Sequence, residues 1–429
     1  MASVKALSSH EIHPSHLPFR LIAAGTVGNI LEWYDFAVYG YFAPTIGQHF
    51  FPSEDPASSL IAAFGVFAAG FLMRPLGGVV FGHLGDLVGC KFALTLSVLA
   101  MAIPTFLIGI LPGHSTLGYA APVLLVILRM IQGLSVGGEY TTSIVFLVEG
   151  AGRNRRGFTG SWSGFGAIGG ILLGSAVGAL VAVTFSQDEV ARWAWRLPFL
   201  AGLFVGLAGL VVRRHIPEVH RPEKPRAGQS PVWEALSSEW RAILRIVLLN
   251  VINGAGFYIA FVFLVTYMQM VGGLRESEAL EINTLNMLFL LMVIPFSGWL
   301  SDRIGRKPLL VAGISGLLIF SWPFFWALHQ QSVTWNFLGQ LGFSIFVGLY
   351  GGALPVAMVE ATPRAVRCSA ICIGYNLIVG ILGGMTPMVA TWLIQRTHDD
   401  LSPAFFVMGA AAISLVAALN WPEPSNSEI

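Results

Sequence analysis

Long apolar stretches follow one another along this chain, separated by short polar connections. Each is long enough for a helix that crosses a bilayer core of about 30 Å, which takes about 20 residues. We count twelve, at roughly 18–46, 58–82, 92–112, 119–148, 157–184, 194–213, 242–271, 280–300, 308–328, 334–359, 366–395 and 403–421. This pattern predicts an all-α membrane protein with twelve transmembrane helices.

A charged motif occurs twice, each time between two apolar stretches. Gly, Asp, Gly and Lys lie at 82, 86, 89 and 91 and again at 298, 302, 305 and 307, an offset of 216 residues in a chain of 429. Such a repeat predicts two pseudo-symmetric halves of six helices each. We expect a tail at 1–17, a first bundle at 18–213, a linker at 214–241, a second bundle at 242–421 and a tail at 422–429.

The composition and the placement of charge agree with a membrane protein. The chain is 55% hydrophobic and 11% charged, with a mean hydropathy of +0.71, whereas soluble chains are about 25% charged. Of the 24 Lys and Arg residues, 18 fall on the side of the termini, four on the opposite side and two within spans. This bias predicts cytoplasmic termini in the plasma membrane, the inner membrane of a bacterium. The polar tail 1–17 is not expected to be a cleavable signal.

Few sequence features suggest chemistry. The three cysteines make no disulfide framework, the scattered His and Cys suggest neither a nucleophile–base set nor a metal site, and no phosphate-binding loop is present. We therefore predict no enzyme, no metal, no nucleic-acid partner and no ATP-driven pump. A channel, a membrane sensor and a non-coupled facilitator are the other classes, but the sequence favours a secondary transporter. It is expected to act as a monomer in the bilayer on a small-molecule substrate.

Five ionisable residues are predicted to lie well inside spans: Glu32, Asp35, Arg74, Arg129 and Glu139. Such groups are costly at membrane depth and mark functional sites by default. Three acids against two arginines leave one surplus negative charge, which favours one protonated acid. We therefore expect Glu32 or Glu139, and then Asp35, to carry a proton, with Arg129 tuning it and no other cofactor. The alternative is that Asp35 and Glu139 pair with Arg74 and Arg129 to hold helices together.

Uncharged polar residues are the candidates in the second half. They are Asn250, Asn253, Tyr258, Tyr267, Asn286, Tyr350, Tyr375 and Asn376, of which Tyr258 and Asn376 are favoured because each lies in a glycine-rich stretch where a helix can break. In the first half, the fifth span carries glycines at 166, 170, 174 and 178. This strip predicts close helix packing in lipid.

These motifs resemble the major facilitator superfamily. The repeated Gly-x-x-x-Asp-x-x-Gly-x-Lys loop is similar to the family's signature, and Arg129-x-x-Gln132-Gly133 to its second motif. The stretches GNILEWYDF (28–36), RPLGG (74–78) and QGLSVGGEYT (132–141) resemble its metabolite–proton symporter branch, which carries proline and betaine, 2-oxoglutarate, shikimate and citrate. The segments around 160–166 and 367–376 look most like the proline/betaine carriers.

The resemblance implies a gate at the cytoplasmic end that holds an outward-open state. Its expected residues are Arg74, Gly82, Asp86, Lys91, Asp302, Arg303, Arg306 and Lys307, with Glu149, Arg156, Glu360 and Arg367 from the second recurring pair. Cys90 stands where a basic residue is usual, as Arg306 does in the second copy, so the first gate is expected to be the weaker. Because the chain ends soon after the last span, we expect no C-terminal coiled coil.

The predicted substrate is a zwitterion such as proline or glycine betaine. The expected membrane interior has a surplus of negative charge, and the second half is expected to have no buried arginine. A zwitterion suits such a site better than a carboxylate. A carboxylate such as 2-oxoglutarate, shikimate or citrate remains the alternative. Arg129 is expected to meet the substrate carboxylate and aromatic faces, Trp33 among them, its ammonium group. The expected substrate-binding residues are Asn29, Tyr34, Tyr39, Arg129, Tyr140, Trp162, Tyr258 and Asn376.

Overall fold

The structure is a computed structural model that describes residues 17–214 and 230–422, and these two stretches contain helices and no strand. Eleven helical segments within them are long and apolar enough to cross a membrane. The remaining long helix is α1 (Leu17–Tyr41), which contains Arg20, Glu32 and Asp35. The prediction of an all-helical protein with twelve spans is thereby confirmed.

The first half runs from α1 to α10. Its helices after α1 are α2 (Ala43–Phe50), α3 (Pro56–Leu72), α4 (Arg74–Leu87), α5 (Cys90–Ile110), α6 (His114–Leu117), α7 (Ala120–Glu149), η1 (Arg153–Arg155), α8 (Arg156–Thr184), α9 (Gln187–Arg192), η2 (Ala194–Arg196) and α10 (Leu197–Arg214). The short helices α2, α6 and α9 lie in connections that the sequence pattern treats as loops or span ends.

The second half follows α11 (Pro231–Ser237), a short helix that forms within the expected linker, where Ser230 caps it and Pro231 begins it. Its helices are α12 (Trp240–Ile252), η3 (Asn253–Phe257), η4 (Ile259–Phe263), α13 (Leu264–Met270), α14 (Glu276–Ile304), α15 (Arg306–His329), α16 (Val333–Glu360), η5 (Arg364–Val366), α17 (Arg367–Ile378), η6 (Val379–Gly383), α18 (Gly384–Thr397) and α19 (Ser402–Leu419). The linker residues 215–229 and the two tails 1–16 and 423–429 lie outside the described residues.

Two of the predicted spans are broken inside by π-helical segments. The seventh contains η3 and η4, and the eleventh contains η6. Both breaks fall in glycine-rich sequence, where the cost of irregular backbone is low. π-helical turns inside α-helices are often found at functional sites.

Two glycines of the repeated motif are explained by their backbone. Gly89 joins α4 to α5 with a φ of 119°, and Gly305 joins α14 to α15 with a φ of 96°. Residues with a side chain rarely adopt these angles, so glycine is required for both turns.

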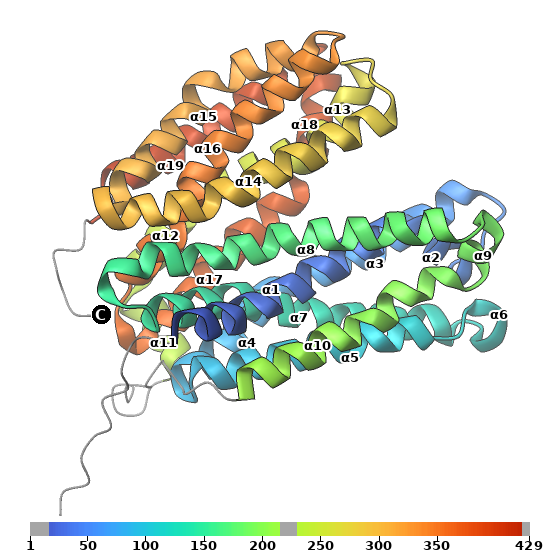
Figure 1. Cartoon of the computed structure of the whole chain (residues 1–429), viewed down its shortest axis with the longest axis horizontal. Helices are drawn as coiled ribbons and strands as arrows, with labels where there is room; N and C mark the ends of the chain where they lie inside the picture. Colours follow the sequence, from blue (N-terminus) through green and yellow to red (C-terminus); the bar gives the residue numbers. More distant parts are fainter. Residues whose placement is uncertain (1–16, 215–229, 423–429) are drawn as a thin grey trace, which may run out of the picture.

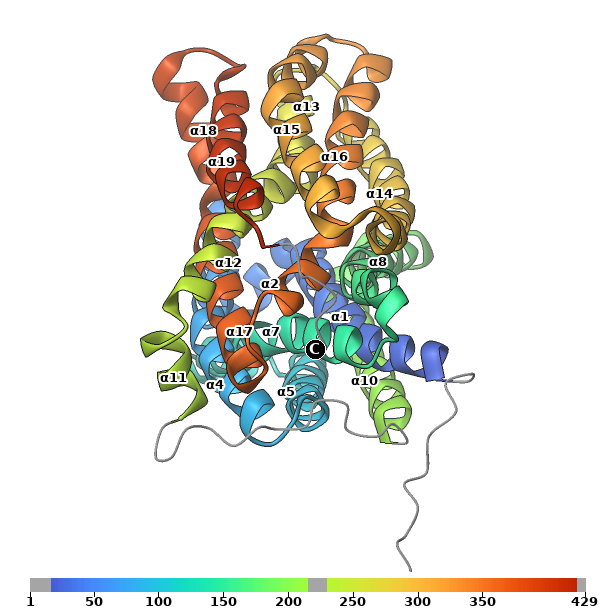
Figure 2. The same ribbon diagram turned by 90° about the vertical axis from the view of Figure 1, so that its left-hand side faces the viewer.

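The two halves meet along the side where α1 begins and α19 ends, here called the terminus side, and diverge toward the opposite side (Figure 1). Figure 2, which faces the terminus side, shows α17 beside α4 and α8 beside α14. Small residues allow these contacts: a methyl group on Gly82 of α4 would lie 2.8 Å from the Cα of Ser369, and one on Gly298 of α14 would lie 2.5 Å from the Gly157 carbonyl.

The glycine strip of α8 packs within the first half, as predicted. Methyl groups at Gly170 and Gly174 would lie 2.5 Å and 2.7 Å from carbonyl oxygens of α1, and Gly166 and Gly178 also face that helix. The strip therefore lets α1 and α8 approach closely, which stabilises the helix pair in lipid.

Candidate functional site

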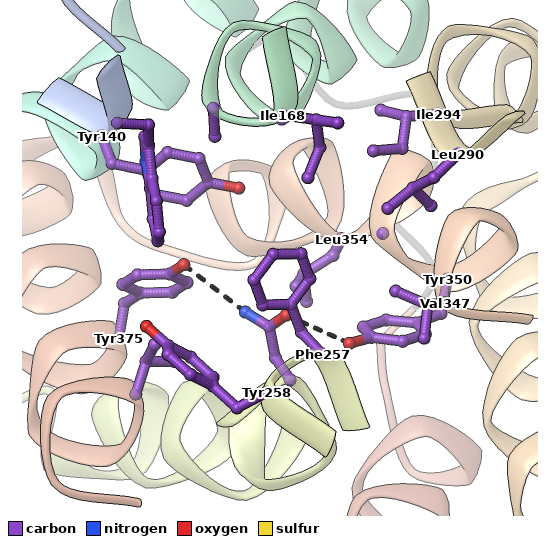
Figure 3. Close-up of a pocket in the computed structure, with 16 residues that line it drawn as sticks. Tyr140, Ile168, Phe257, Tyr258, Leu290, Ile294, Val347, Tyr350, Leu354 and Tyr375 are labelled. Atoms are coloured by element: carbon purple, nitrogen blue, oxygen red, sulfur yellow. Dashed lines mark hydrogen bonds between the residues drawn. The ribbon is translucent and has the colours of Figure 1, made fainter. Parts of the chain in front are cut away.

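A small cavity of about 60 Å³ lies between the two halves. Helices α1, α7 and α8 line it from one half, and η3, α14, α16, α17 and η6 from the other (Figure 3). Its residues are Trp33, Tyr140, Gly164, Ala167, Ile168, Asn253, Phe257, Tyr258, Leu290, Ile294, Val347, Tyr350, Gly351, Leu354, Tyr375 and Val379. None of these residues is charged.

Aromatic side chains from both halves form much of the wall of this cavity. The rings of Tyr140 and Tyr375, from opposite halves, lie 5.1 Å apart between centroids, and those of Trp33 and Phe257 lie 6.4 Å apart. The cavity therefore offers several π faces to a ligand, some from each half.

Asn253 organises the rings contributed by the second half. Its side chain accepts a hydrogen bond from the Tyr350 hydroxyl at 3.0 Å and donates one to the Tyr375 hydroxyl at 3.5 Å, shown as dashed lines in Figure 3. Asn253 and Phe257 are the first and last residues of η3. The π-helical geometry of η3 thus helps to set where these side chains enter the cavity.

One buried ion pair lies within the first half, away from the cavity lining. Arg129 of α7 pairs with Asp35 of α1, and its guanidinium lies 3.7 Å from the centre of the Tyr39 ring. Asp35 also accepts hydrogen bonds from Thr105 at 2.9 Å and from Gln132 at 3.0 Å. This network fits the structural alternative for Asp35 rather than a role as a free proton carrier.

A second buried pair joins Glu139 of α7 to Arg213 near the end of α10, and Ser97 donates to the same carboxylate. Arg213 is only 3% exposed and also donates to the Ala24 carbonyl at 2.9 Å and to the Leu94 carbonyl. Arg213 ends the predicted span 194–213 and is one of the 18 cations assigned to the terminus side. The long side chain reaches inward, which adds a third arginine to the buried charges.

Arg213 joins Arg74 and Arg129 as a third buried arginine of the first half. Asp86, 1% exposed near the end of α4, joins Glu32, Asp35 and Glu139 as a fourth buried acid. The acids still exceed the arginines by one. The expectation that the second half has no buried arginine is wrong: Arg367 of α17 is 4% exposed, although it lies on the terminus side and away from the cavity lining.

Neither Glu32 nor Arg74 has a close ion-pair partner among the described residues. Both Glu32 oxygens and both terminal nitrogens of Arg74 lack a hydrogen bond, although each residue is at most 1% exposed. The charges of Arg74 and Glu139 act on Glu32. A buried carboxylate without hydrogen bonds is costly when ionised, so Glu32 is the carboxylate with most to gain from a proton.

Arg74 lies between the halves rather than in the gate. Its Nε lies 3.5 Å from Oδ1 of Asn376, at the limit of a hydrogen bond, and its guanidinium is 5.4 Å from the Phe71 ring centre. Its charge acts on the cavity residues Tyr140, Tyr258 and Tyr375. The contacts of Arg74 therefore differ from its predicted place in the gate.

Of the predicted substrate-binding residues, Tyr140 and Tyr258 line the cavity, as does Trp33, which was expected to offer an aromatic face. The others have structural partners: Asn29 donates to Ser143, Tyr34 to the Pro198 carbonyl, Tyr39 to the Ala63 carbonyl and Asn376 to the Gly137 carbonyl, while Arg129 pairs with Asp35 and Trp162 packs on Phe165. Phe257 was missed, because an apolar ring in an apolar stretch gives no sequence signal. Its glycine-rich neighbourhood was the available clue.

Asp86 forms the first of two contacts that close the terminus side. Its carboxylate accepts hydrogen bonds from the backbone N–H groups of Cys368 and Ser369, both at 2.8 Å, at the start of α17. A carboxylate is favourable there because the N-terminus of a helix carries partial positive charge. Arg367 of the same helix pairs with Glu149 of the first half, and both are nearly buried. These bonds join α4 and α7 to the second half.

Asp302 forms the pseudo-symmetric contact. It accepts from the backbone N–H groups of Gly157 and Phe158, at 2.8 and 2.9 Å, at the start of α8. Arg306 lies 3.0 Å from the Asp302 carboxylate and donates twice to Glu360, both times at 3.0 Å. Here the basic residue of the motif holds the acidic residue of its own half.

The two contacts differ in which half supplies the arginine that holds the glutamate. Where Arg306 occupies Glu360, Arg156 is left facing the charge of Glu360 without a hydrogen bond of its own from Nε. In the first copy Arg367 of the other half pairs with Glu149. The first contact therefore includes an ion pair between the halves, and the weaker first gate stays a prediction.

The other residues predicted for the gate differ in whether they lie at the contact between the halves. Gly82 lies at the α4–α17 contact as expected. Arg303 is exposed and stacks 3.9 Å over the Trp299 ring, and Lys91 lies 3.4 Å from the Arg214 carbonyl within its own half. Lys307 is partly exposed. The gate is therefore made mainly by the two aspartates, Arg306, Arg367 and the two glutamates, and less by the other motif cations.

Comparison with known proteins identifies relatives over nearly the whole chain. A family model described as Major Facilitator Superfamily matches residues 25–387. A proline/betaine transporter of Salmonella typhimurium is 33% identical over 420 residues, which are 95% of this chain and 84% of the relative. A glycine betaine/proline/ectoine/pipecolic acid transporter, OusA of Dickeya dadantii, is 34% identical over 423 residues, 96% of this chain and 84% of the relative.

Solved structures share the fold. The proton:xylose symporter XylE matches with a TM-score of 0.77 at 18% identity, over 96% of this chain and 97% of that one. The fucose:proton symporter FucP of Escherichia coli matches with a TM-score of 0.74 at 14% identity, over 94% and 98%. At these identities the likeness concerns the arrangement of helices.

Proposed function

Because the chain belongs to the major facilitator superfamily, we propose that it is a proton-coupled symporter that imports a zwitterionic compatible solute of the proline or glycine betaine kind. The family and the named relatives make it a transporter of small molecules in a membrane and not an enzyme. The proton as coupling ion, the direction of transport, the functional monomer and the cytoplasmic termini are parts of the proposal.

The observation that carries the proposal is the uncharged aromatic lining of the central cavity. A quaternary or secondary ammonium group gains about 0.5–2 kcal/mol from each aromatic face that it contacts. A dicarboxylate or tricarboxylate would bring two or three negative charges to a lining without Lys or Arg. The names of the relatives at 33–34% identity agree with a zwitterion.

We assign the substrate carboxylate to Arg74 and the proton to Glu32. Arg129, the earlier candidate for the carboxylate, already pairs with Asp35. Arg74 retains two terminal nitrogens without hydrogen bonds and lies close enough to Tyr140, Tyr258 and Tyr375 to act on them. A substrate carboxylate at Arg74 would withdraw the one positive charge that favours ionised Glu32, so substrate and proton would bind together.

With cytoplasmic termini, the closed terminus side makes this an outward-facing conformation. Transport then requires the contacts of Asp86 and Asp302 with α17 and α8 to break while the opposite side closes. Each contact joins a helix of one half to a helix of the other, as expected for two halves that rock about a central site.

The test is uptake by purified protein in proteoliposomes under an imposed pH gradient. Labelled glycine betaine should accumulate, and excess unlabelled betaine or proline should block uptake, whereas citrate and 2-oxoglutarate should not. Inhibition in the reverse order would refute the zwitterion assignment and favour a carboxylate carrier. Trp33→Leu should raise KM for betaine by about 2- to 30-fold, the factor that corresponds to one lost aromatic contact.

Coupling is tested by Glu32→Gln, with Glu276→Gln, an exposed acid on α14, as the matched control. Glu32→Gln should abolish accumulation driven by the pH gradient but retain exchange of labelled for unlabelled substrate. Accumulation at the wild-type level by Glu32→Gln would exclude Glu32 as the proton carrier. Loss of both activities, with folding intact, would also contradict the assigned role.

A further inference from the structure

Two cysteines from opposite halves face each other at the first gate contact. The Sγ atoms of Cys90 and Cys368 are 3.1 Å apart, although the residues are 278 positions apart in the chain. Neither forms a disulfide, and both are fully buried. Cys90 begins α5 and Cys368 is the second residue of α17, so the pair spans the junction between the halves.

Neighbouring residues hold the two thiols in this position. Asp86 binds the backbone N–H of Cys368 directly, and the turn at Gly89 brings Cys90 back toward α4. A methyl group at Gly85 would lie 2.8 Å from the Cys368 Sγ, so this glycine makes room for the thiol. The pair is therefore built into the gate rather than left at a mobile surface.

We propose that Cys90 and Cys368 form a redox modification site, at which hydrogen peroxide creates a disulfide that locks the terminus side closed. One thiol attacks the peroxide O–O bond, forming a sulfenic acid and releasing water. The second thiol then attacks the sulfenic sulfur; the S–S bond forms, the S–O bond breaks and a second water leaves. Two thiols are oxidised and one peroxide is reduced, so the step balances.

The geometry requires little movement for the second step. A disulfide has an S–S length of about 2.0 Å, so the sulfurs must approach by about 1 Å from their observed separation. The third cysteine, Cys372, lies one turn further along α17 and interacts with the Thr141 hydroxyl at 2.9 Å. It is therefore the internal control for the pair.

Access to the thiols rests on the proposed function. In the structure both sulfurs are buried, but alternating access must separate α17 from α4 and expose them on the terminus side. Peroxide can then form the sulfenic acid, and the next closure brings the partner thiol against it. A covalent bond between the halves would keep that side from reopening, so transport would stop until a dithiol reductant cleaved the bond.

The direct test does not depend on transport. A protease site is introduced at residues 215–229, between the halves, and membranes with the full chain are treated with hydrogen peroxide before cleavage. On a non-reducing gel the halves should stay joined, and dithiothreitol should release them. Cys372→Ser should behave like the parent protein, whereas Cys90→Ser and Cys368→Ser should each abolish the link. Halves that separate after peroxide treatment of folded parent protein, or remain joined in both serine variants, would overturn the proposal.

Transport provides the second readout. Peroxide should reduce betaine uptake by the parent protein and by Cys372→Ser to the level of protein-free liposomes, with recovery after dithiothreitol, and should spare Cys90→Ser. A link that forms without loss of uptake would refute the lock. If untreated protein transports no zwitterion but the link forms, the proposed substrate fails and the thiol pair stands.

Discussion

The ion pair between Glu139 and Arg213 permits a quantitative test of the buried network. Arg213→Met removes the cation and leaves Glu139 buried with only the Ser97 hydroxyl as a donor. Breaking a buried pair by removing one partner typically costs about 3–5 kcal/mol. Glu139→Gln leaves Arg213 with two backbone carbonyl acceptors, so it should cost less, about 1.5–3 kcal/mol for a charge-assisted hydrogen bond.

The double variant separates charge from packing. With Gln at 139 no unpaired carboxylate remains, so Arg213→Met should cost about 2 kcal/mol less in that background than alone, within the range of coupling energies between contacting residues. This corresponds to about a 30-fold difference in the ratio of folded to unfolded protein. We expect the same sign of coupling in any detergent or lipid.

The assay is unfolding by sodium dodecyl sulfate in mixed micelles, followed by tryptophan fluorescence, for the parent, both single variants and the double variant. Arg214→Met is the matched control, because Arg214 neighbours Arg213 but is exposed, and its substitution should change the free energy of unfolding little. Additivity of the two single changes within about 0.5 kcal/mol would refute the pairing.

Three further predictions concern other parts of the network. Asp302→Asn should weaken the contact with α8, because an amide retains one acceptor for two N–H groups. Thiol labelling of a cysteine placed on the terminus side should then be faster, by about tenfold for each 1.4 kcal/mol of contact free energy lost. Labelling equal to that of Asp188→Asn would contradict this prediction. Gly28→Ala should lower the melting temperature, since its methyl group would overlap the ion pair just described, whereas Gly40→Ala, with nothing within 4 Å, should not. Asn253→Ala should raise KM for betaine because two tyrosine hydroxyls lose their partner; an unchanged KM would remove Asn253 from the site.

The fold and the gate could be predicted because their signals are local in the sequence. Charges are rare in an apolar chain, so the motif around Asp86 and its copy around Asp302 stand out without any knowledge of contacts. Their spacing also fixes the halves, and the turns at Gly89 and Gly305 follow from the glycines themselves. The backbone partners of both aspartates on the other half could not be predicted, because a motif does not identify the helix that it touches.

The charge network could not be predicted from depth along a helix alone. Arg213 stands beside Arg214 at the end of a span, where long cations usually extend to the membrane surface, yet it turns inward to Glu139. The pairing of Glu149 with Arg367 was missed for a related reason. The repeat suggests equivalent partners in both copies, but Glu149 pairs with an arginine of the other half whereas Glu360 pairs with Arg306 of its own half.

The lining of the cavity could not be predicted from sequence periodicity, because part of it comes from irregular helix. Trp33 and Tyr140 come from regular helices, but Asn253 and Phe257 come from a π-helical segment, where the angular spacing of side chains differs from that of an α-helix. An assignment based on 3.6 residues per turn therefore puts these side chains on the wrong face.

The π-helical segments also bear on mechanical compliance. Among the described residues, all three lie in the second half, two in the seventh span and one in the eleventh, and they flank the cavity where Asn253 and Tyr258 enter it. The first half instead has α1 and α8 packed closely along a strip of glycines and tied by buried ion pairs. The two halves are pseudo-symmetric in topology but unequal in stiffness. Deformation during the transport cycle should therefore concentrate in the second half, which would bend around the solute. The first half should move nearly as a rigid body.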